Sequence, residues 1–200
     1  MYRRICRAAA LAAVALLGAV PTAAQAKATP TDRAFVREMI PHHRMAVDMA
    51  DMARMQAKHQ QITTLAKSII EDQNAEIREL TAIRKRLQVK PLPSGDAEHE
   101  AMMRDADTLG LSMESMAMDM NMNELDGAKP FDRKFIDMMI PHHQGAIRMA
   151  RAELAKGTSA KLRTIARAIV AAQKREILQM NSWRKAWYGA TSPSGGIPPS

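Results

Sequence analysis

Apolar residues along the chain form one continuous run, at residues 8–20, and several periodic segments. In the periodic segments the apolar positions recur every three or four residues, which is the spacing of an amphipathic helix. This pattern predicts four long helices, over residues 31–57, 60–88, 130–156 and 160–188. Pro91 and Pro93 end the second of these, and a turn at 157–159 separates the last two. The periodicity therefore predicts an all-α protein.

The continuous run has the properties of a secretory leader. Three arginines precede it, and Ala24-Gln25-Ala26 follows it as a small-x-small cleavage signature. The run is shorter than the roughly 20 residues that span a bilayer. We therefore predict a signal peptide over residues 1–26, an exported protein that is periplasmic or extracellular, and no stable insertion into a membrane.

The predicted helices belong to two copies of one unit. Residues 32–43 (DRAFVREMIPHH) return at a constant offset as residues 132–143 (DRKFIDMMIPHH), and the match continues into the next helix. Two hairpins that each expose an apolar face bury it most simply against each other, which predicts a four-helix bundle. The expected parts are a first hairpin repeat (27–93), a Met-rich spacer with a short helix (94–127), a second hairpin repeat (128–188) and a disordered tail (189–200), with 27–188 forming a single domain.

Pro41 and Pro141 interrupt the predicted helices at the same point of both repeats. A proline inside a helix removes a backbone hydrogen bond and crowds the preceding turn, at about 3 kcal/mol or more. We expect a kink or a break there, beside the histidines. Thr31 or Asp32 is the expected N-cap of the first helix.

Composition and charge narrow the possible partners. The leader holds three of the 29 basic residues and none of the 21 acidic ones, so the mature chain carries a net charge of about +5. The basic residues are interspersed with acidic ones, and aromatic residues make up only 4% of the chain. Neither a basic stripe nor a stacking platform is present, which argues against a nucleic-acid partner. The single cysteine lies in the leader, so the mature chain has no thiol ligand and no disulfide.

Adjacent histidines beside methionines are the strongest candidate ligands: His42 with His43, and His142 with His143. Neighbouring residues on a helix point about 100° apart. The methionines spaced by three or seven residues share the face of the first histidine, and they are Met39, Met45, Met49, Met139 and Met149. Imidazole and thioether together suit Cu(I), whereas Mg²⁺ and Ca²⁺ prefer oxygen ligands. The alternative is that the methionines simply fill the core.

The spacer is rich in methionine, with Met113, Met116, Met118, Met120 and Met122 within ten residues. In an extended chain four of these thioethers would line one side, whereas in a helix they would divide between two faces. They are candidates for a third copper site, with core packing and reversible oxidation as alternatives. His59 and His99 are not repeated and are expected to be solvated, although His99 lies near these methionines.

The second helix of each repeat also carries a repeated polar pair: Gln73 with Glu76, and Gln173 with Glu176. The spacing of three places each pair on one face of its helix. These side chains either orient the histidines by hydrogen bonds or belong to the bundle surface.

The segment Met-Ile-Pro-His-His-x-x-Ala-x-x-Met-Ala, at residues 39–50 and 139–150, resembles the signature of the family called domain of unknown function 305. The resemblance covers essentially the whole mature chain and implies an exported, ferritin-like helical bundle. Some members, such as those of the CopM type, are periplasmic copper-binding proteins. This implies copper handling at His42, His43, Met45, Met49, His142, His143 and Met149. The first copy has Arg44-Met45 where the second has the more typical Gln144-Gly145, so we expect two related but unequal sites.

The leading hypothesis is an exported, non-enzymatic protein that holds Cu(I), and also Ag(I), for buffering, sequestration or transfer to a copper transporter or oxidase. One alternative is a metal-free helical interaction module. Another is a di-iron enzyme, which would use Glu-x-x-His motifs on two helices. That motif is absent, because Glu38 stands four residues before His42 and its counterpart is Met138.

Overall fold

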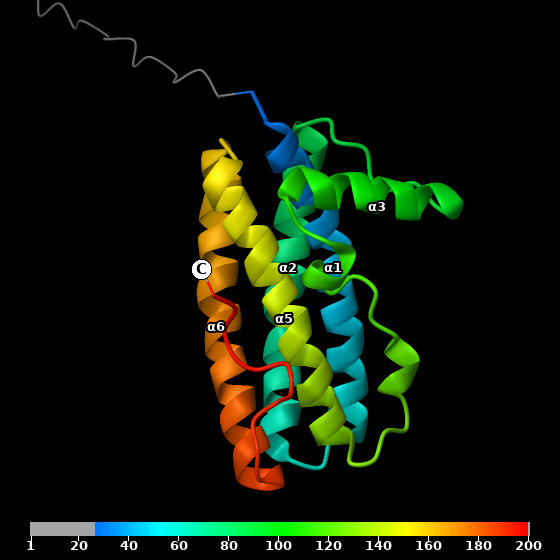
Figure 1. Ribbon diagram of the computed structural model, residues 1–200, viewed down its shortest axis with the longest axis vertical. Coiled ribbons are helices and arrows are strands. Elements are labelled where there is room, and N and C mark those ends of the chain that lie inside the picture. Colours follow the sequence, from blue (N-terminus) through cyan, green and yellow to red (C-terminus); the bar gives the residue numbers. More distant parts are fainter. Residues whose placement is uncertain (1–26, 200) are drawn as a thin grey trace, which may run out of the picture.

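The computed structural model describes residues 27–199, and these residues form an all-α four-helix bundle. Its long helices are α1 (Pro30–Gln56), α2 (Gln60–Arg86), α5 (Phe131–Lys156) and α6 (Ala160–Tyr188), which run side by side (Figure 1). This confirms the predicted fold class. Within the described residues, no helix is both long and apolar enough to cross a membrane. The predicted signal peptide lies outside the described residues.

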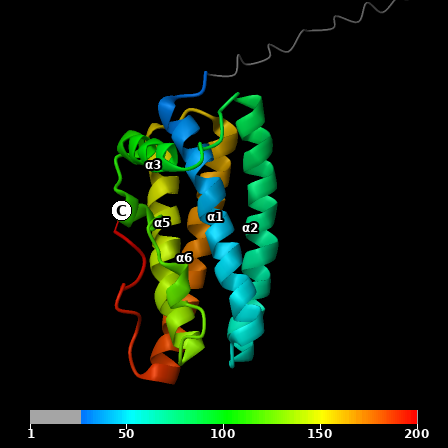
Figure 2. The same ribbon diagram turned by 90° about the vertical axis from the view of Figure 1, so that its right-hand side faces the viewer.

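The bundle is held together through α1 and α5. Each hairpin is closed by contacts between its own helices, α1 with α2 and α5 with α6, and α1 packs against α5 to join the two hairpins (Figure 2). Equivalent apolar residues of the two repeats are buried alike, each being at most 1% exposed. They are Phe35 and Phe135, Ile40 and Ile140, Ala46 and Ala146, and Met49 and Met149. Burial of each large apolar side chain contributes roughly 1.5–3 kcal/mol, so the repeated apolar stripe forms the core.

Two equivalent aspartates link the hairpins at their ends. The Asp32 carboxylate on α1 accepts hydrogen bonds from the backbone N–H groups of Thr158 (3.1 Å) and Ser159 (2.9 Å), which lead into α6. Asp132 on α5 accepts them from Lys58 (3.0 Å) and His59 (2.8 Å), which lead into α2. Each repeat therefore caps the turn of the other, and satisfies N–H groups that a helix start leaves free.

Asp32 is fully buried, and its protonation state follows from these bonds. Burial raises the pKa of Asp32, but hydrogen bonds from the backbone of Ser159 and Thr29 outweigh that effect and lower the pKa from 3.8 to about 2. Nearby, burial and then the Asp32 carboxylate raise the pKa of Glu153 to about 9, so Glu153 is neutral at pH 7. Asp32 and Glu153 together thus carry one negative charge, and the backbone N–H groups of Thr158 and Ser159 stabilise it.

The helix ends differ from the prediction in two respects. Thr29, rather than Thr31 or Asp32, is the N-cap of α1; Pro30 occupies the first turn and Asp32 completes a capping box with Thr29. Proline is favoured in the first turn because it has no N–H to leave unpaired. Pro41 lies inside a continuous α1, and Pro141 inside a continuous α5, so neither helix is broken at the histidines.

The spacer contains three short helical elements instead of one. They are α3 (Asp96–Leu109), α4 (Met113–Met116) and the 3-10 turn η1 (Met122–Glu124). Gly110, in the left-handed conformation at φ 74°, ends α3, which extends sideways from the bundle (Figure 1). The paired side chains of Arg37 and Asp105 connect α3 to α1.

The expected disordered tail is instead packed against the bundle. Residues 189–199 turn back along α5 and α6 (Figure 1), and polar side chains of these helices bind their carbonyls. The Gln144 amide donates to the carbonyl of Ser194 (2.8 Å), and the Asn181 amide donates to that of Gly195 (2.8 Å). The composition of this segment prevents a helix, but its carbonyls satisfy amides that are otherwise buried.

The charge on Asp32 predicts how stability depends on pH. A folded-state pKa below the unfolded value contributes stability above pH 3.8, which is lost as the pH falls toward 2. Asp32→Asn should therefore lower the free energy of unfolding by about 2 kcal/mol at pH 7. Urea titrations from pH 7 to pH 2 should show this difference shrinking below pH 3.8. Asp48→Asn, an exposed change on the same helix, is the control, and an equal pH dependence in both variants would contradict the assignment.

Candidate metal centre

The two Met-Ile-Pro-His-His segments face each other across the α1–α5 contact. The imidazole rings of His42 and His142 lie with their centroids 3.8 Å apart and their planes inclined by 32°. Both side chains are 0% exposed, as are those of His43 and His143. The duplicated motif therefore produces one buried group of imidazoles at the centre of the bundle, rather than the two separate sites that we expected.

The outer histidines of this group bind carboxylates on the neighbouring helices. The Nε2 atom of His43 lies 2.7 Å from the Glu76 carboxylate on α2, and that of His143 lies 2.5 Å from the Glu176 carboxylate on α6. In each repeat the two rings of the pair are 6.3 Å apart. The hydrogen bonds orient the outer rings, which is one of the two roles that the sequence left open for Glu76 and Glu176. Gln73 and Gln173 are also buried, and within the described residues their amide oxygens have no hydrogen-bond partner.

Several imidazole nitrogens in this group are buried without a hydrogen bond from any described residue. They are both ring nitrogens of His42 and His142, and the Nδ1 atoms of His43 and His143. An unsatisfied buried polar group destabilises a fold by about 1–3 kcal/mol. A concentration of unsatisfied imidazole nitrogens at one point, repeated in both copies of the motif, is typical of a ligand-binding site.

The inner imidazoles are in the form that can ligate a metal. Burial lowers the pKa of His42 and of His142 well below 6.5, and the neighbouring imidazoles lower each pKa further. The backbone carbonyl of Met116 acts on His42 in the opposite direction without reversing the shift. Both rings are therefore neutral at pH 7, and each neutral ring has one nitrogen with a free lone pair.

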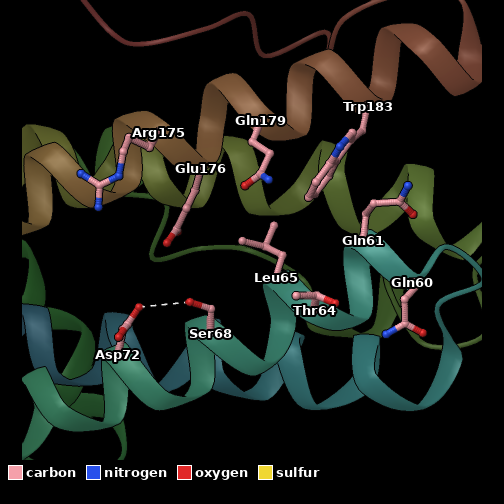
Figure 3. A pocket seen from close by; sticks show the side chains of 10 residues that line it. All are labelled: Gln60, Gln61, Thr64, Leu65, Ser68, Asp72, Arg175, Glu176, Gln179 and Trp183. Carbon is pink, nitrogen blue, oxygen red and sulfur yellow. Dashed lines mark hydrogen bonds between the residues drawn. The ribbon is translucent and has the colours of Figure 1, made fainter.

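A groove between α2 and α6 brings solvent close to this group (Figure 3). It has a volume of about 680 Å³, and Glu176 projects into it from α6 near Leu65 of α2. The Glu176 side chain is 16% exposed and that of Glu76 is 23% exposed, whereas the side chains of His43 and His143 are fully buried. The carboxylates are thus the solvent-facing end of the buried imidazole group.

The methionines predicted as ligands of the histidine pairs are mostly core residues. Met39, Met49, Met139 and Met149 are 0% exposed and pack in the hydrophobic clusters of the bundle, while Met45 is half-buried against them. The spacing of three still places Met39 and Met139 on the faces of the inner histidines. Met39 and Met139 therefore remain the candidate thioether donors for that pair.

The spacer methionines do not form one row of ligands. Met116 is completely buried in the cluster that includes Met39 and Phe35, and Met113 and Met118 pack against its edge. Met120 and Met122 contact the other cluster, around Phe135. The structure thus separates the five methionines into groups with different surroundings.

The Met45/Gly145 difference between the repeats has a packing explanation. A Cβ atom on Gly145 would lie 2.2 Å from the Met116 carbonyl oxygen, so only glycine allows α4 to approach α5 here. The backbone of Met116 also acts on His42, where it partly offsets the lowering of that pKa. Sequence reasoning did not identify this backbone group, although the loss of a side chain at one copy of a repeated position was a signal for it.

The donor set fits a soft metal ion of low coordination number. His42 and His142 supply neutral imidazole nitrogens, and thioethers lie on the same helix faces. Among residues 27–199, no three His, Cys, Asp or Glu side chains converge on one point. Imidazole and thioether ligands together suit Cu(I).

Comparison with known families agrees with the motif. The model of the family described as "Domain of unknown function (DUF305)" matches residues 32–195. The chain belongs to this family. Among curated protein sequences, none is significantly similar to the chain.

Solved structures of DUF305 proteins share the bundle. CopM in its Cu(I)-bound form is 33% identical, with a TM-score of 0.65, over 79% of this chain and 98% of that chain. CopM in its Cu(II)-bound form is 36% identical, with a TM-score of 0.65, over 78% of this chain and 97% of that chain. A DUF305 protein from Streptomyces coelicolor is 23% identical, with a TM-score of 0.70, over 82% and 96% of the two chains, and shows the fold alone.

The contact at Gly145 predicts a loss of stability on adding one methyl group. Alanine within a helix is normally more favourable than glycine by about 1 kcal/mol. Gly145→Ala should instead reduce the free energy of unfolding by about 1–3 kcal/mol, because α4 must move away. Urea denaturation measures the change. Gly196→Ala is the control, since no atom of residues 27–199 lies within 4 Å of its Cβ position. A more stable Gly145→Ala variant would show that α4 does not pack here.

Proposed function

We propose that this DUF305 protein binds copper as Cu(I) at the buried His42–His142 pair, for buffering, sequestration or transfer. The observation that carries the proposal is the pair itself: two imidazoles with centroids 3.8 Å apart, fully buried, with no described hydrogen-bond partner on any ring nitrogen. The similarity to CopM, which has been solved with Cu(I) and Cu(II), supports copper as the metal.

The chemistry of the donors favours the monovalent ion. Neutral imidazoles and thioethers add no charge, so the buried site carries only the charge of the ion. That charge, and the free energy needed to bury it, is smallest for a monovalent ion. The protein would supply a dry core, and Glu76 and Glu176 would fix the outer rings by their hydrogen bonds to His43 and His143. Ag(I) has the same charge and softness, and CopM has also been solved with Ag bound.

Export and a delivery role complete the proposal. The apolar run at residues 8–20 favours secretion to the periplasm or the medium. In an oxidising compartment a methionine thioether survives where a thiol would be oxidised, which accords with a mature chain rich in methionine and without cysteine. A copper transporter or an oxidase is the partner that such a protein would serve.

A catalytic di-iron site is less well supported by the side chains present. Glu38, the acidic residue on α1 nearest in sequence to His42, is fully buried, and burial followed by Asp105 raises its pKa to about 9. A neutral carboxyl is a poor ligand for iron. The equivalent position on α5 is Met138, so a symmetrical carboxylate site cannot form.

Copper competition tests the proposed site. The purified protein, titrated anaerobically with Cu(I) against a chromogenic chelator, should withdraw copper from it. His42→Leu combined with His142→Leu should weaken this competition at least about tenfold, which corresponds to 1.4 kcal/mol or more. Met55→Leu is the control, because Met55 is 84% exposed on the same helix. No competition by the natural protein would refute copper binding, and undiminished competition by the double variant would refute the His42–His142 assignment alone.

The stability of the same double variant separates a metal site from a structural one. Replacing unsatisfied buried polar groups by apolar groups of similar size is neutral or stabilising. Without metal, the leucine variant should therefore melt at the same temperature or higher, by about 2–4 °C for each kcal/mol gained. Thermal denaturation followed by circular dichroism measures this. A large decrease would favour the alternative of a metal-free interaction module whose histidines are structural.

A further inference from the structure

We propose a second soft-metal site on the surface of the spacer, formed by His99 and Met102 of α3 with Met113, the first residue of α4, and Met118, two residues after its end. It would take Cu(I) or Ag(I). The site extends the proposed copper function, but it shares no residue with the His42–His142 pair and can be tested separately.

These side chains line one small pocket. The pocket has a volume of about 250 Å³, and its donors are His99, Met102, Met113 and Met118, with Glu98 and Asp119 beside them. His99 and Met102 share a face of α3, because they are three residues apart. The contact between α3 and α4 brings this face to the remaining methionines.

The backbone fixes the distance between Met113 and Met118. The N–H group of Met118 donates to the carbonyl of Met113 at 3.1 Å, and this bond closes the C-terminal end of α4. It requires Ala117 to adopt the left-handed conformation at φ 56°, which is unfavourable by about 1–2 kcal/mol for a residue with a side chain. Two residues five apart in sequence are thus held together at one side of the pocket.

The donors select a soft cation. Three thioethers and one imidazole are ligands that suit Cu(I) and Ag(I), whereas Ca²⁺ requires six or more oxygen ligands. Two carboxylates, Glu98 and Asp119, also line the pocket, and their negative charge would attract a cation to the rim.

Exposure distinguishes this pocket from the central pair. His99 is exposed, and Met102, Met113 and Met118 are half-buried, so an ion can reach them without any opening of the bundle. Core packing accounts for only part of this arrangement, because Met113 and Met118 pack on the core but His99 and Met102 do not belong to it. A surface site of this kind would exchange metal faster than the sealed imidazoles.

Silver titration followed by NMR tests the proposal. The full protein is labelled at the methionine methyl carbons, and Ag(I) is added as the probe. The methyl signals of Met102, Met113 and Met118 should shift together and saturate once one equivalent beyond that held by the central pair has bound, each signal being assigned by its Met→Leu variant. Leucine keeps the volume of methionine, so the fold is retained at a loss below about 1.5 kcal/mol. The fourfold variant, with Met102→Leu, Met113→Leu, Met118→Leu and His99→Gln, should bind one Ag(I) fewer.

The controls separate the possible outcomes. Met103 follows Met102 on α3 and is 48% exposed but does not line the pocket, so its signal should not move. Equal shifts at Met103 and Met55 would mean nonspecific thioether binding and would overturn the proposal. Loss of the central ion in the His42→Leu, His142→Leu variant, with the spacer shifts retained, would support it. Unmoved spacer signals while the central pair still binds would overturn the second site alone.

Discussion

The contact between α1 and α5 determines where the polar groups of this protein lie. The two helices come from copies of one unit and pack through equivalent positions, so His42 meets His142. A polar residue at this contact therefore occurs twice at the centre of the core, where water cannot form hydrogen bonds with it. The outer contacts repeat in the same way, since His43 binds Glu76 as His143 binds Glu176. The bundle accepts unsatisfied imidazoles only because a large apolar stripe on each helix surrounds them.

The spacer breaks this symmetry on one side only. Met116 lies over Gly145 on α5, whereas the equivalent Met45 on α1 keeps its side chain and is half-buried. The two copies of the motif therefore have different surroundings, although their histidines are arranged alike. The repeated motif supplies the paired imidazoles, and the difference at a single position, Met45 or Gly145, allows the connecting segment to cover one of the two helices.

Periodicity and repetition were sufficient to predict the four long helices. The start of α2 at Gln60, the end of α5 at Lys156 and the bounds of α6 follow directly from apolar spacing and from glycine, proline and turn residues. The repeat also indicated the polar partners Glu76 and Glu176, because it marked them as a pair on one face of each second helix. Local sequence carries this information, since it depends on residues a few positions apart.

Long-range features were not predictable in the same way. The sequence suggested one site per repeat, because no local pattern indicates that His42 and His142, one hundred positions apart, lie side by side in the folded protein. The tail was expected to be disordered from its composition, yet Gln144 and Asn181 bind its carbonyls. The continuity of α1 through Pro41 is similar: packing on α2 and α5 compensates for the hydrogen bond that proline removes.

The crossed aspartate caps have a consequence for how the chain folds. The turn of each hairpin presents backbone N–H groups whose acceptor, Asp32 or Asp132, belongs to the other hairpin. One hairpin alone would leave these groups without that acceptor and its apolar face exposed to water. Two hairpins are therefore the smallest unit that satisfies its own backbone, whether they occur in one chain or in a dimer of single units. Opening one turn also releases the start of the helix in the other half, so both halves should unfold as a single cooperative unit.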